Sequence, residues 1–295
     1  MLKNFIKKIR YFFEAVIVEI ALWFFSVIGV QGSSNMAAAL SKFVGKKLKV
    51  NQLAYRNLTK AMPELSEEKK IEILEDMWDN LGRIVGEFGY IGKSSPEEIC
   101  SFIEVSQEQK QNIDFVRQSK AGAILISGHI GNWEIGPKFF LNYGIKVKTI
   151  YRPLNNPYVE KLTSTLRGVE LIEKGANGSR QIIETIKNGG FILIMADQKV
   201  SEGEPVKFFN HDAITATSVA RIALKYGVPI IPVCSVRLGR EFKFAVEIEK
   251  PLAIERSEDL NFDVLKLTRQ INMKLESWIR KRPAQWFWVH DRWKN

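Results

Sequence analysis

The chain has 295 residues, of which 45% are hydrophobic and 26% are charged, and this balance excludes an intrinsically disordered protein. The length is sufficient for one large domain or two small ones. The 43 Lys and Arg residues outnumber the 33 Asp and Glu residues, which gives a formal net charge of +10 at pH 7. A surface of this sign favours an anionic partner, either a nucleic acid, a phospholipid or a phosphorylated substrate.

The chain contains two cysteines, Cys100 and Cys234. Two are too few for a disulfide framework and their spacing is not that of metal ligands, so we expect neither a metal nor another cofactor. Because both lie beside apolar residues, we interpret them as buried free thiols. A reducing cytoplasmic location fits this use of cysteine.

A basic cluster followed by an apolar stretch marks the amino terminus. The apolar stretch, residues 11–30, is long enough to cross a bilayer as a helix. However, Glu14 and Glu19 interrupt it, and each would cost about 2.5–3.5 kcal/mol near the centre of a spanning helix. We therefore expect residues 1–32 to form a membrane-associated helix that lies in the interface, with its basic end on anionic lipid. A spanning helix, a cleaved signal peptide and a helix packed on the domain are the alternatives.

Residues 33–295 are expected to form one domain whose first part, residues 33–118, is helical. Gly32-Ser33-Ser34-Asn35 is the one short break that would separate it from the membrane segment. Apolar residues then recur at helical spacing over residues 36–48, 53–62 and 67–91. Ser66 followed by Glu67 and Glu68 is typical of a capped helix start.

From residue 119 onward, short apolar runs alternate with helical patterns. This alternation predicts an α/β fold with a mixed central sheet flanked by helices. The expected strands are residues 123–127, 147–151, 170–172, 191–196, 230–236 and 242–248. The expected helices are residues 133–143, 157–167, 179–187, 216–226 and 260–281.

Three of the predicted strands are followed by a polar side chain that can carry chemistry. His129 comes after the strand 123–127, Arg152 after 147–151, and Asp197 after 191–196. Functional groups in α/β sheets gather beyond the carboxyl ends of the strands, so we expect these three side chains to lie at one edge. The chain has only three histidines, and no role is assigned to the other two, His211 and His290.

The segment Ser127-Gly128-His129-Ile130-Gly131-Asn132-Trp133-Glu134 is the candidate catalytic centre. With His129 in a strand-to-helix turn and Glu134 in the first helical turn, the two side chains can converge, as an imidazole base and the carboxylate that orients it. The same residues have a purely structural interpretation. Glu134 then only stabilises a helix start behind the N-cap Asn132, and His129 is a buried histidine.

This segment resembles the H-x4-D/E motif of the lysophospholipid acyltransferase superfamily, and its Gly-Asn-Trp-Glu continuation is similar to the lipid A late-acyltransferase branch, the lauroyl/myristoyl transferases. Other blocks agree in order. They are Arg56-Asn57-Leu58 with Met62-Pro63-Glu64, Tyr151-Arg152-Pro153 with Asn156-Pro157, Met195-Ala196-Asp197-Gln198, and the C-terminal block Pro283–Trp293. The ending departs from the family pattern at Asp291, where a basic residue is more usual.

The resemblance implies direct acyl transfer without a covalent enzyme intermediate. His129 would take the proton from a substrate hydroxyl that attacks an acyl thioester, and Glu134 would fix the imidazole tautomer. Arg152, Asp197 and Asn132 are expected to bind substrate. The implied donor is acyl carrier protein, and the implied acceptor is an anionic lipid A precursor. The implied location is the inner (plasma) membrane, with the catalytic domain on the cytoplasmic face.

Two alternative functions remain open at this point. One keeps the superfamily and changes the acceptor to another glycolipid, such as a phosphatidylinositol mannoside. The other is a non-enzymatic basic protein that binds a membrane surface or nucleic acid. The basic and aromatic residues are not arranged as an RNA-binding motif, and no zinc-finger spacing is present, so we expect no nucleic-acid partner.

Overall fold

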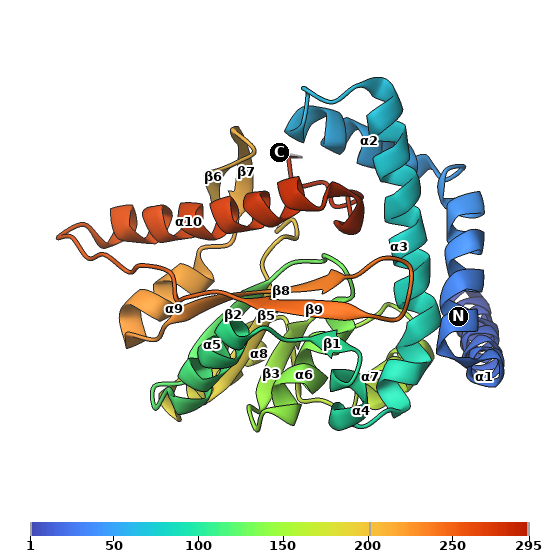
Figure 1. Ribbon diagram of the computed structural model, residues 1–295, viewed down its shortest axis with the longest axis horizontal. Helices are drawn as coiled ribbons and strands as arrows, with labels where there is room; N and C mark the ends of the chain where they lie inside the picture. Colours follow the sequence, from blue (N-terminus) through green and yellow to red (C-terminus); the bar gives the residue numbers. More distant parts are fainter. Residues whose placement is uncertain (1, 201, 294–295) are drawn as a thin grey trace.

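A seven-stranded sheet forms the centre of the computed structural model, which describes residues 2–200 and 202–293 (Figure 1). The strand order is β1-β9-β8-β2-β5-β3-β4, and β8 and β9 pair antiparallel whereas the other neighbours are parallel. The mixed sheet predicted from the sequence is therefore confirmed. The strands are β1 Ile103–Glu104, β2 Ala123–Ser127, β3 Val147–Tyr151, β4 Leu171–Glu173, β5 Phe191–Met195, β8 Ile230–Arg237 and β9 Phe244–Ile248.

Helices cover both faces of the sheet because successive strand side chains point to opposite faces. Ile124 and Ile126 of β2 pack with residues of α9 and α10, whereas Leu125 packs with residues of α5 and α6 on the other face (Figure 1). Burial on both faces explains why β2 reads as an unbroken apolar run. The helices of this part are α4 Pro96–Cys100, α5 Gln107–Gln118, α6 Gly136–Asn142, α7 Pro157–Arg167, α8 Ala176–Lys187, α9 Ser218–Tyr226 and α10 Leu260–Lys281.

Three helices precede the sheet: α1 Leu2–Gly45, α2 Lys49–Ala61 and α3 Glu67–Lys93. α1 and α3 lie side by side at one end of the sheet (Figure 1). Their backbones approach so closely that a Cβ atom at Gly82 of α3 would lie 2.3 Å from the carbonyl oxygen of Ala37 in α1. The predicted break at residues 32–35 is wrong, since these residues are helical. The helix is interrupted instead at Gly29, which has a φ of 73°.

The amino-terminal part of α1 exposes an apolar surface. α1 is long and apolar enough over Phe5–Gly45 to cross a membrane, as judged by length and composition. Its large hydrophobic side chains recur every three or four residues and are exposed, among them Phe5, Ile9, Phe13, Ile17, Trp23 and Val27. This confirms the prediction of an apolar N-terminal helix.

One hairpin was not anticipated from the sequence. β6 (Glu204–Phe208) and β7 (His211–Thr215) form an antiparallel hairpin that packs beside α10. It buries only alternate side chains and carries charges on its outer face, so its apolar signal is weak. The composition of the tryptophan-rich C-terminal segment suits either a membrane interface or a tail packed on the core, and the structure shows the second, with Trp286 and Trp288 fully buried.

Candidate active site

The turn after β2 presents His129 at the edge of the sheet and leads directly into a short 3₁₀ helix, η1 (Trp133–Ile135). Gly131 has a φ of 59°, and a Cβ atom there would lie 2.2 Å from the carbonyl oxygen of Ser235, so the turn requires glycine. The Asn132 side chain accepts a hydrogen bond from the backbone N–H of Glu134, which confirms its prediction as the N-cap. The backbone N–H of Phe287 donates to the carbonyl of His129, so the C-terminal segment fixes the turn from outside.

His129 is bound to Asp197 of the neighbouring strand end. β2 and β5 are parallel, with Ser127 opposite Met195. His129 and Asp197 each follow this pair by two positions, so they also lie close together. His129 Nδ1 lies 2.8 Å from Asp197 Oδ1, and the backbone N–H of His129 donates to Asp197 Oδ2 at 2.7 Å. The buried indole N–H of Trp286 donates to the same Oδ2 at 2.8 Å.

The Asp197 carboxylate is charged although it is fully buried. Burial by itself would raise the pKa of this carboxyl, but the neighbouring His129, through its charge and hydrogen bonds, holds the pKa well below its usual range. A charged carboxylate at Nδ1 requires that Nδ1 carry a proton, so in the neutral imidazole the lone pair lies on Nε2. This is the tautomer that a general base needs.

The expected pairing of His129 with Glu134 does not occur in the structure. Glu134 binds Arg167 of α7 through two hydrogen bonds, from Nε at 2.9 Å and from Nη2 at 2.8 Å. Although burial by itself would lower the pKa of the Arg167 guanidinium, the bonds to Glu134 raise it above its usual value. Both oxygens of Glu134 accept hydrogen bonds from the guanidinium. The carboxylate that binds the His129 imidazole is that of Asp197, which follows the adjacent strand.

His129 and Glu134 both line one cavity of about 170 Å³. We call it the basic cavity, because its wall also carries the cations Arg152, Arg167 and Lys174. Arg167 is neutralised by Glu134, so Arg152 and Lys174 give the cavity a net positive charge. The remaining wall is largely apolar and includes Phe88, Ile91, Trp133, Pro137, Leu154 and Leu171.

A second cavity of about 210 Å³ adjoins the basic cavity. We call it the apolar cavity, since aliphatic side chains of β5, of the loop after β5 and of α8, α9 and α10 form much of its lining, beside Glu173, Lys174 and several hydroxyl side chains. The aliphatic side chains include Ile182, Ile194, Val200, Val219 and Ile271. Four residues line both cavities and so lie between them: Ile150, Lys174, Met195 and Gln198.

The three residues expected to bind substrate occupy different environments. Arg152 lines the basic cavity. Asp197 lies behind His129, with its carboxylate bonded to His129 and Trp286, so it faces neither Arg152 nor the cavity. Asn132 is also fully buried, and its amide nitrogen donates to Glu87 of α3 at 2.8 Å. The structure thus gives Asn132 and Asp197 positions that support the turn, outside the cavity lining.

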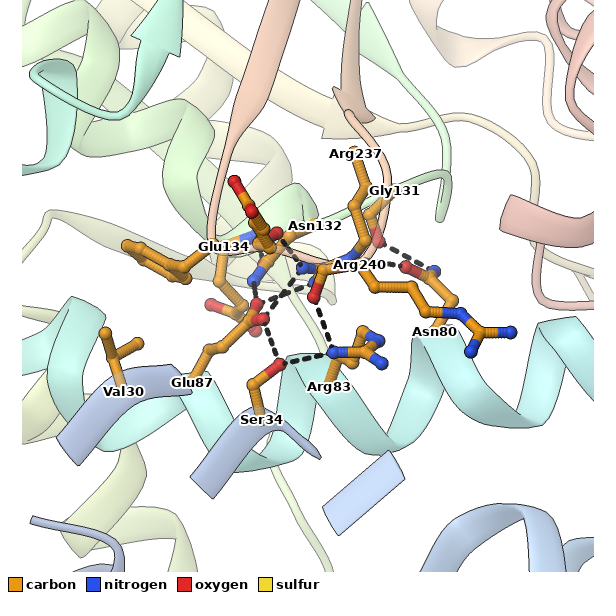
Figure 2. A network of polar contacts seen from close by, with 12 residues as sticks. Val30, Ser34, Asn80, Arg83, Glu87, Gly131, Asn132, Glu134, Arg237 and Arg240 are labelled. Atoms are coloured by element: carbon orange, nitrogen blue, oxygen red, sulfur yellow. Dashed lines mark hydrogen bonds and ion pairs between the residues drawn. The ribbon is translucent and has the colours of Figure 1, made fainter. Parts of the chain in front are cut away.

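Asn132 belongs to a buried polar network behind the turn (Figure 2). Arg237 of β8 makes a bidentate ion pair with Glu87, at 2.8 and 2.7 Å, and both side chains are almost fully buried. Asn80 of α3 accepts from Arg237 and donates to the carbonyl of Gly131. Ser34 of α1 donates to Glu87, so the network connects α1, α3, β8 and the turn (Figure 2).

Several residues around the His129 ring had no predicted role. The His290 ring lies 5.0 Å from the His129 ring, and burial lowers the pKa of His290 to about 4, which keeps it neutral. Gln198 contacts the His129 ring, and Lys174 in turn donates a hydrogen bond to Gln198. Gln198 and His290 do lie in motif blocks quoted above, but those blocks give no geometry. His211, by contrast, is exposed on β7.

The cysteines lie outside the linings of both cavities. Cys234 is buried, as predicted, and Cys100 is partly buried. Burial raises the pKa of the Cys100 thiol to about 11, and it raises that of Cys234 further. Both thiols are therefore protonated at neutral pH and unsuited to act as nucleophiles.

Comparison with known proteins agrees with this geometry. The family described as bacterial lipid A biosynthesis acyltransferase matches residues 2–295. The lipid A biosynthesis myristoyltransferase of Escherichia coli (strain K12) is 21% identical over 258 residues, which cover 85% of this chain and 78% of that protein. The lipid A biosynthesis lauroyltransferase of the same organism is 25% identical over 265 residues, covering 86% of this chain and 81% of that protein. The resemblance drawn from the motif blocks is confirmed, and the chain belongs to the bacterial lipid A biosynthesis acyltransferase family.

Proposed function

We propose that this acyltransferase moves a fatty acyl group from the thioester of acyl carrier protein to a hydroxyl of a lipid A precursor, at the cytoplasmic face of the inner membrane. The observation that carries the proposal is the setting of His129. Its Nδ1 is bound to a buried carboxylate, and its ring lines a cavity with net positive charge. An imidazole so oriented is the general base that a hydroxyl nucleophile requires.

In the proposed reaction, the acceptor hydroxyl gives its proton to His129 Nε2 as its oxygen bonds to the thioester carbonyl carbon. The carbon–sulfur bond then breaks, and the thiolate leaves with the proton from the imidazolium. Asp197 holds the imidazole in the correct tautomer and stabilises the imidazolium through its negative charge. Glu134 acts on the cavity by holding Arg167 in its wall.

The charges of the site support an anionic acceptor and an acidic donor. Arg152 and Lys174 both line the basic cavity, where a phosphate or a sugar acid of the acceptor can pair with them. The chain as a whole carries a net charge of +10, which favours encounter with an acidic carrier protein. The adjoining apolar cavity is the proposed site of the acyl chain, because aliphatic side chains such as Ile182, Ile194 and Val219 form much of its wall.

The position of α1 supports access from a membrane. Asn156, at the start of α7, donates to the Tyr11 carbonyl and to the Glu14 carboxylate of α1, at 2.8 and 2.9 Å. The apolar surface of α1 therefore lies beside α7. Arg167 of α7 and Leu154, in the loop before α7, both line the basic cavity. A lipid acceptor held by the membrane would have a short path to His129.

The proposal is tested by substituting the base. Purified full-length chain is incubated with acyl carrier protein loaded with fatty acids of several lengths and with tetra-acylated lipid A precursor, and product mass is followed. We expect wild-type chain to add one acyl group, and we expect His129→Ala to lower the rate by about 10²–10⁴-fold, the usual contribution of a general base.

His211→Ala is the matched control, because His211 is exposed on β7 and lies outside both cavity linings. It should transfer acyl groups at the wild-type rate. Equal activity of wild type and His129→Ala would remove His129 as the base. Transfer from the carrier protein to a glycolipid without phosphate, but not to the lipid A precursor, would overturn the proposed acceptor.

A further inference from the structure

The side chain of Gln198 lies directly against the catalytic nitrogen of His129. Gln198 Nε2 is 3.2 Å from His129 Nε2, and Gln198 Oε1 accepts a hydrogen bond from the Lys174 ammonium at 3.1 Å. Gln198 follows Asp197 in the chain, and Lys174 follows β4. A continuous series of hydrogen bonds therefore runs from Lys174 through Gln198 and His129 to Asp197.

The direction of every hydrogen bond in this series is fixed by its two ends. An ammonium can only donate, so the oxygen of the Gln198 amide faces Lys174 and the NH₂ group faces His129. The NH₂ group can only donate, so His129 Nε2 accepts with its lone pair. Nδ1 then carries the proton and donates it to Asp197, which agrees with the charged state of that carboxylate.

This arrangement leaves His129 in its basic form but with its lone pair occupied. No hydroxyl can transfer a proton to Nε2 while the Gln198 amide donates to it. The Gln198 backbone is held in place, because its carbonyl accepts from the buried guanidinium of Arg292 at 3.2 Å. The side chain, which lies between the basic and apolar cavities, can therefore move without displacing the loop.

We propose that Gln198 is a latch on the catalytic base: it holds the Nε2 lone pair of His129 until an anionic acceptor binds, and the acceptor hydroxyl then replaces it. The proposal rests on the proposed function of His129 as the base. Lys174 is the positioning residue that keeps the latch closed. An acceptor phosphate that pairs with Lys174 in the basic cavity would withdraw the ammonium from Oε1 and release the amide.

The latch protects the thioester from water. At an open base, water would give a proton to His129 Nε2 as its oxygen bonds to the thioester carbonyl carbon. The carbon–sulfur bond would break, the thiolate would take the proton from the imidazolium, and a free fatty acid would be released. A water molecule brings no charge to draw Lys174 away, so it must compete with an anchored amide for the lone pair. The latch thus favours the anionic acceptor over water as the nucleophile.

The test measures two products, the acylated acceptor and the free fatty acid, with full-length chain and acyl carrier protein thioester. In Gln198→Ala we expect donor hydrolysis in the absence of acceptor to rise about three- to tenfold, the fold-change that corresponds to one net hydrogen bond. The ratio of free acid to acylated acceptor should rise by the same factor when acceptor is present. A purely structural role would lower both products together and would leave this ratio unchanged.

A second variant opens the latch in a different way. Lys174→Met keeps Gln198 but removes its anchor, so hydrolysis without acceptor should rise in the same direction as in Gln198→Ala. Gln111→Ala is the matched control, since Gln111 is exposed on α5. It should leave both rates at the wild-type values. Adding His129→Ala to Gln198→Ala should abolish the extra hydrolysis, which ties it to the base.

The latch is overturned if folded Gln198→Ala and Lys174→Met both transfer acyl groups and hydrolyse the donor no faster than wild type. It is also overturned if both products fall in parallel. Failure of the proposed function is seen separately, because it appears as full transfer activity in the single variant His129→Ala, whatever the behaviour of Gln198.

Discussion

At the level of single residues, the Asp197 carboxylate determines the hydrogen bonding of His129 at Nδ1 and at its backbone N–H. Its Oδ2 already accepts two hydrogen bonds, from the His129 backbone N–H and from Trp286, and Oδ1 faces His129 Nδ1. Each of these contacts is satisfied only if the group at position 197 has an acceptor at both atoms. The Asp197 side chain is also fully buried, so no water can replace a lost partner easily.

Asp197→Asn is therefore expected to force the wrong tautomer. Two donors face Oδ2, so the amide oxygen must occupy that position and the NH₂ group must point at Nδ1. Nδ1 then becomes an acceptor and Nε2 carries the proton, which removes the base. We expect kcat to fall by about 10²–10⁴-fold with KM nearly unchanged, because Asp197 lies outside the cavity lining. Steady-state kinetics of acyl transfer measure both constants.

Asp212→Asn provides the control, because Asp212 is an exposed residue of β7 that pairs with Lys207. It should keep the wild-type kcat. A folded Asp197→Asn protein with a kcat within tenfold of wild type would show that Asp197 does not set the tautomer of the base.

At the level of elements, the Glu87–Arg237 pair joins α3 to β8 behind the catalytic turn (Figure 2). Both charges are almost completely removed from water, and Asn80, Asn132 and Ser34 each form a hydrogen bond with one of the two side chains. Removing one partner of such a pair leaves the other charge buried and uncompensated. The loss of stability on substituting one partner thus arises mainly from the buried, unpaired charge that remains, and less from the attraction within the pair.

Glu87→Ala is expected to lower the free energy of unfolding by about 3–5 kcal/mol, because the Arg237 guanidinium loses its counter-charge. Chemical denaturation followed by circular dichroism measures the change. The double variant Glu87→Met/Arg237→Met should recover most of the loss, since it leaves no unpaired charge in the network.

The exposed pair of Glu104 and Lys243 serves for comparison. Glu104→Ala should lower the free energy of unfolding far less than Glu87→Ala, because water screens an exposed pair. Equal losses in Glu87→Ala and Glu104→Ala would contradict the view that the buried network fastens α3 and β8 to the turn.

At the level of the whole molecule, the amino-terminal part of α1 exposes a series of large hydrophobic side chains. Its side chains are exposed along the helix, and Ile17 and Trp23 are 66% and 64% exposed. The interruption at Gly29 separates this part from residues 30–45, which pack on α3. The geometry suits a helix that contacts lipid while the remainder of the chain stays in water.

The double variant Ile17→Glu/Trp23→Glu is expected to weaken binding to vesicles of phosphatidylethanolamine and phosphatidylglycerol by at least about tenfold. Burying each of these side chains contributes roughly 1.5–3 kcal/mol, and a carboxylate reverses the sign of that term. Co-sedimentation with the vesicles measures the bound fraction.

Ile71→Glu is the matched control, because Ile71 is also an exposed apolar residue but lies on α3. It should bind vesicles as wild type does. Unchanged binding of the α1 double variant would exclude α1 as the membrane contact and would return it to the role of an ordinary surface helix.

The sequence by itself determined most of the elements and the position of His129 after a strand. The apolar periodicities that predict β2, β5 and α10 are local, and they matched the structure closely because each element buries the face that its pattern marks. The placement of His129 at a strand end followed from the same local patterns. The β6–β7 hairpin escaped prediction, since its strands bury only alternate side chains.

Only the tertiary structure decided which residues contact His129. His129 and Asp197 are 68 positions apart, and they meet because β2 and β5 pair in parallel with a particular register. The short sequence spacing favoured Glu134 as the carboxylate that binds His129, but Glu134 pairs with Arg167 of α7 instead. The contact of Gln198 with Nε2 likewise depends on strand order. Periodicity encodes which face of an element is buried, whereas the identity of the neighbour is set by how the elements pack.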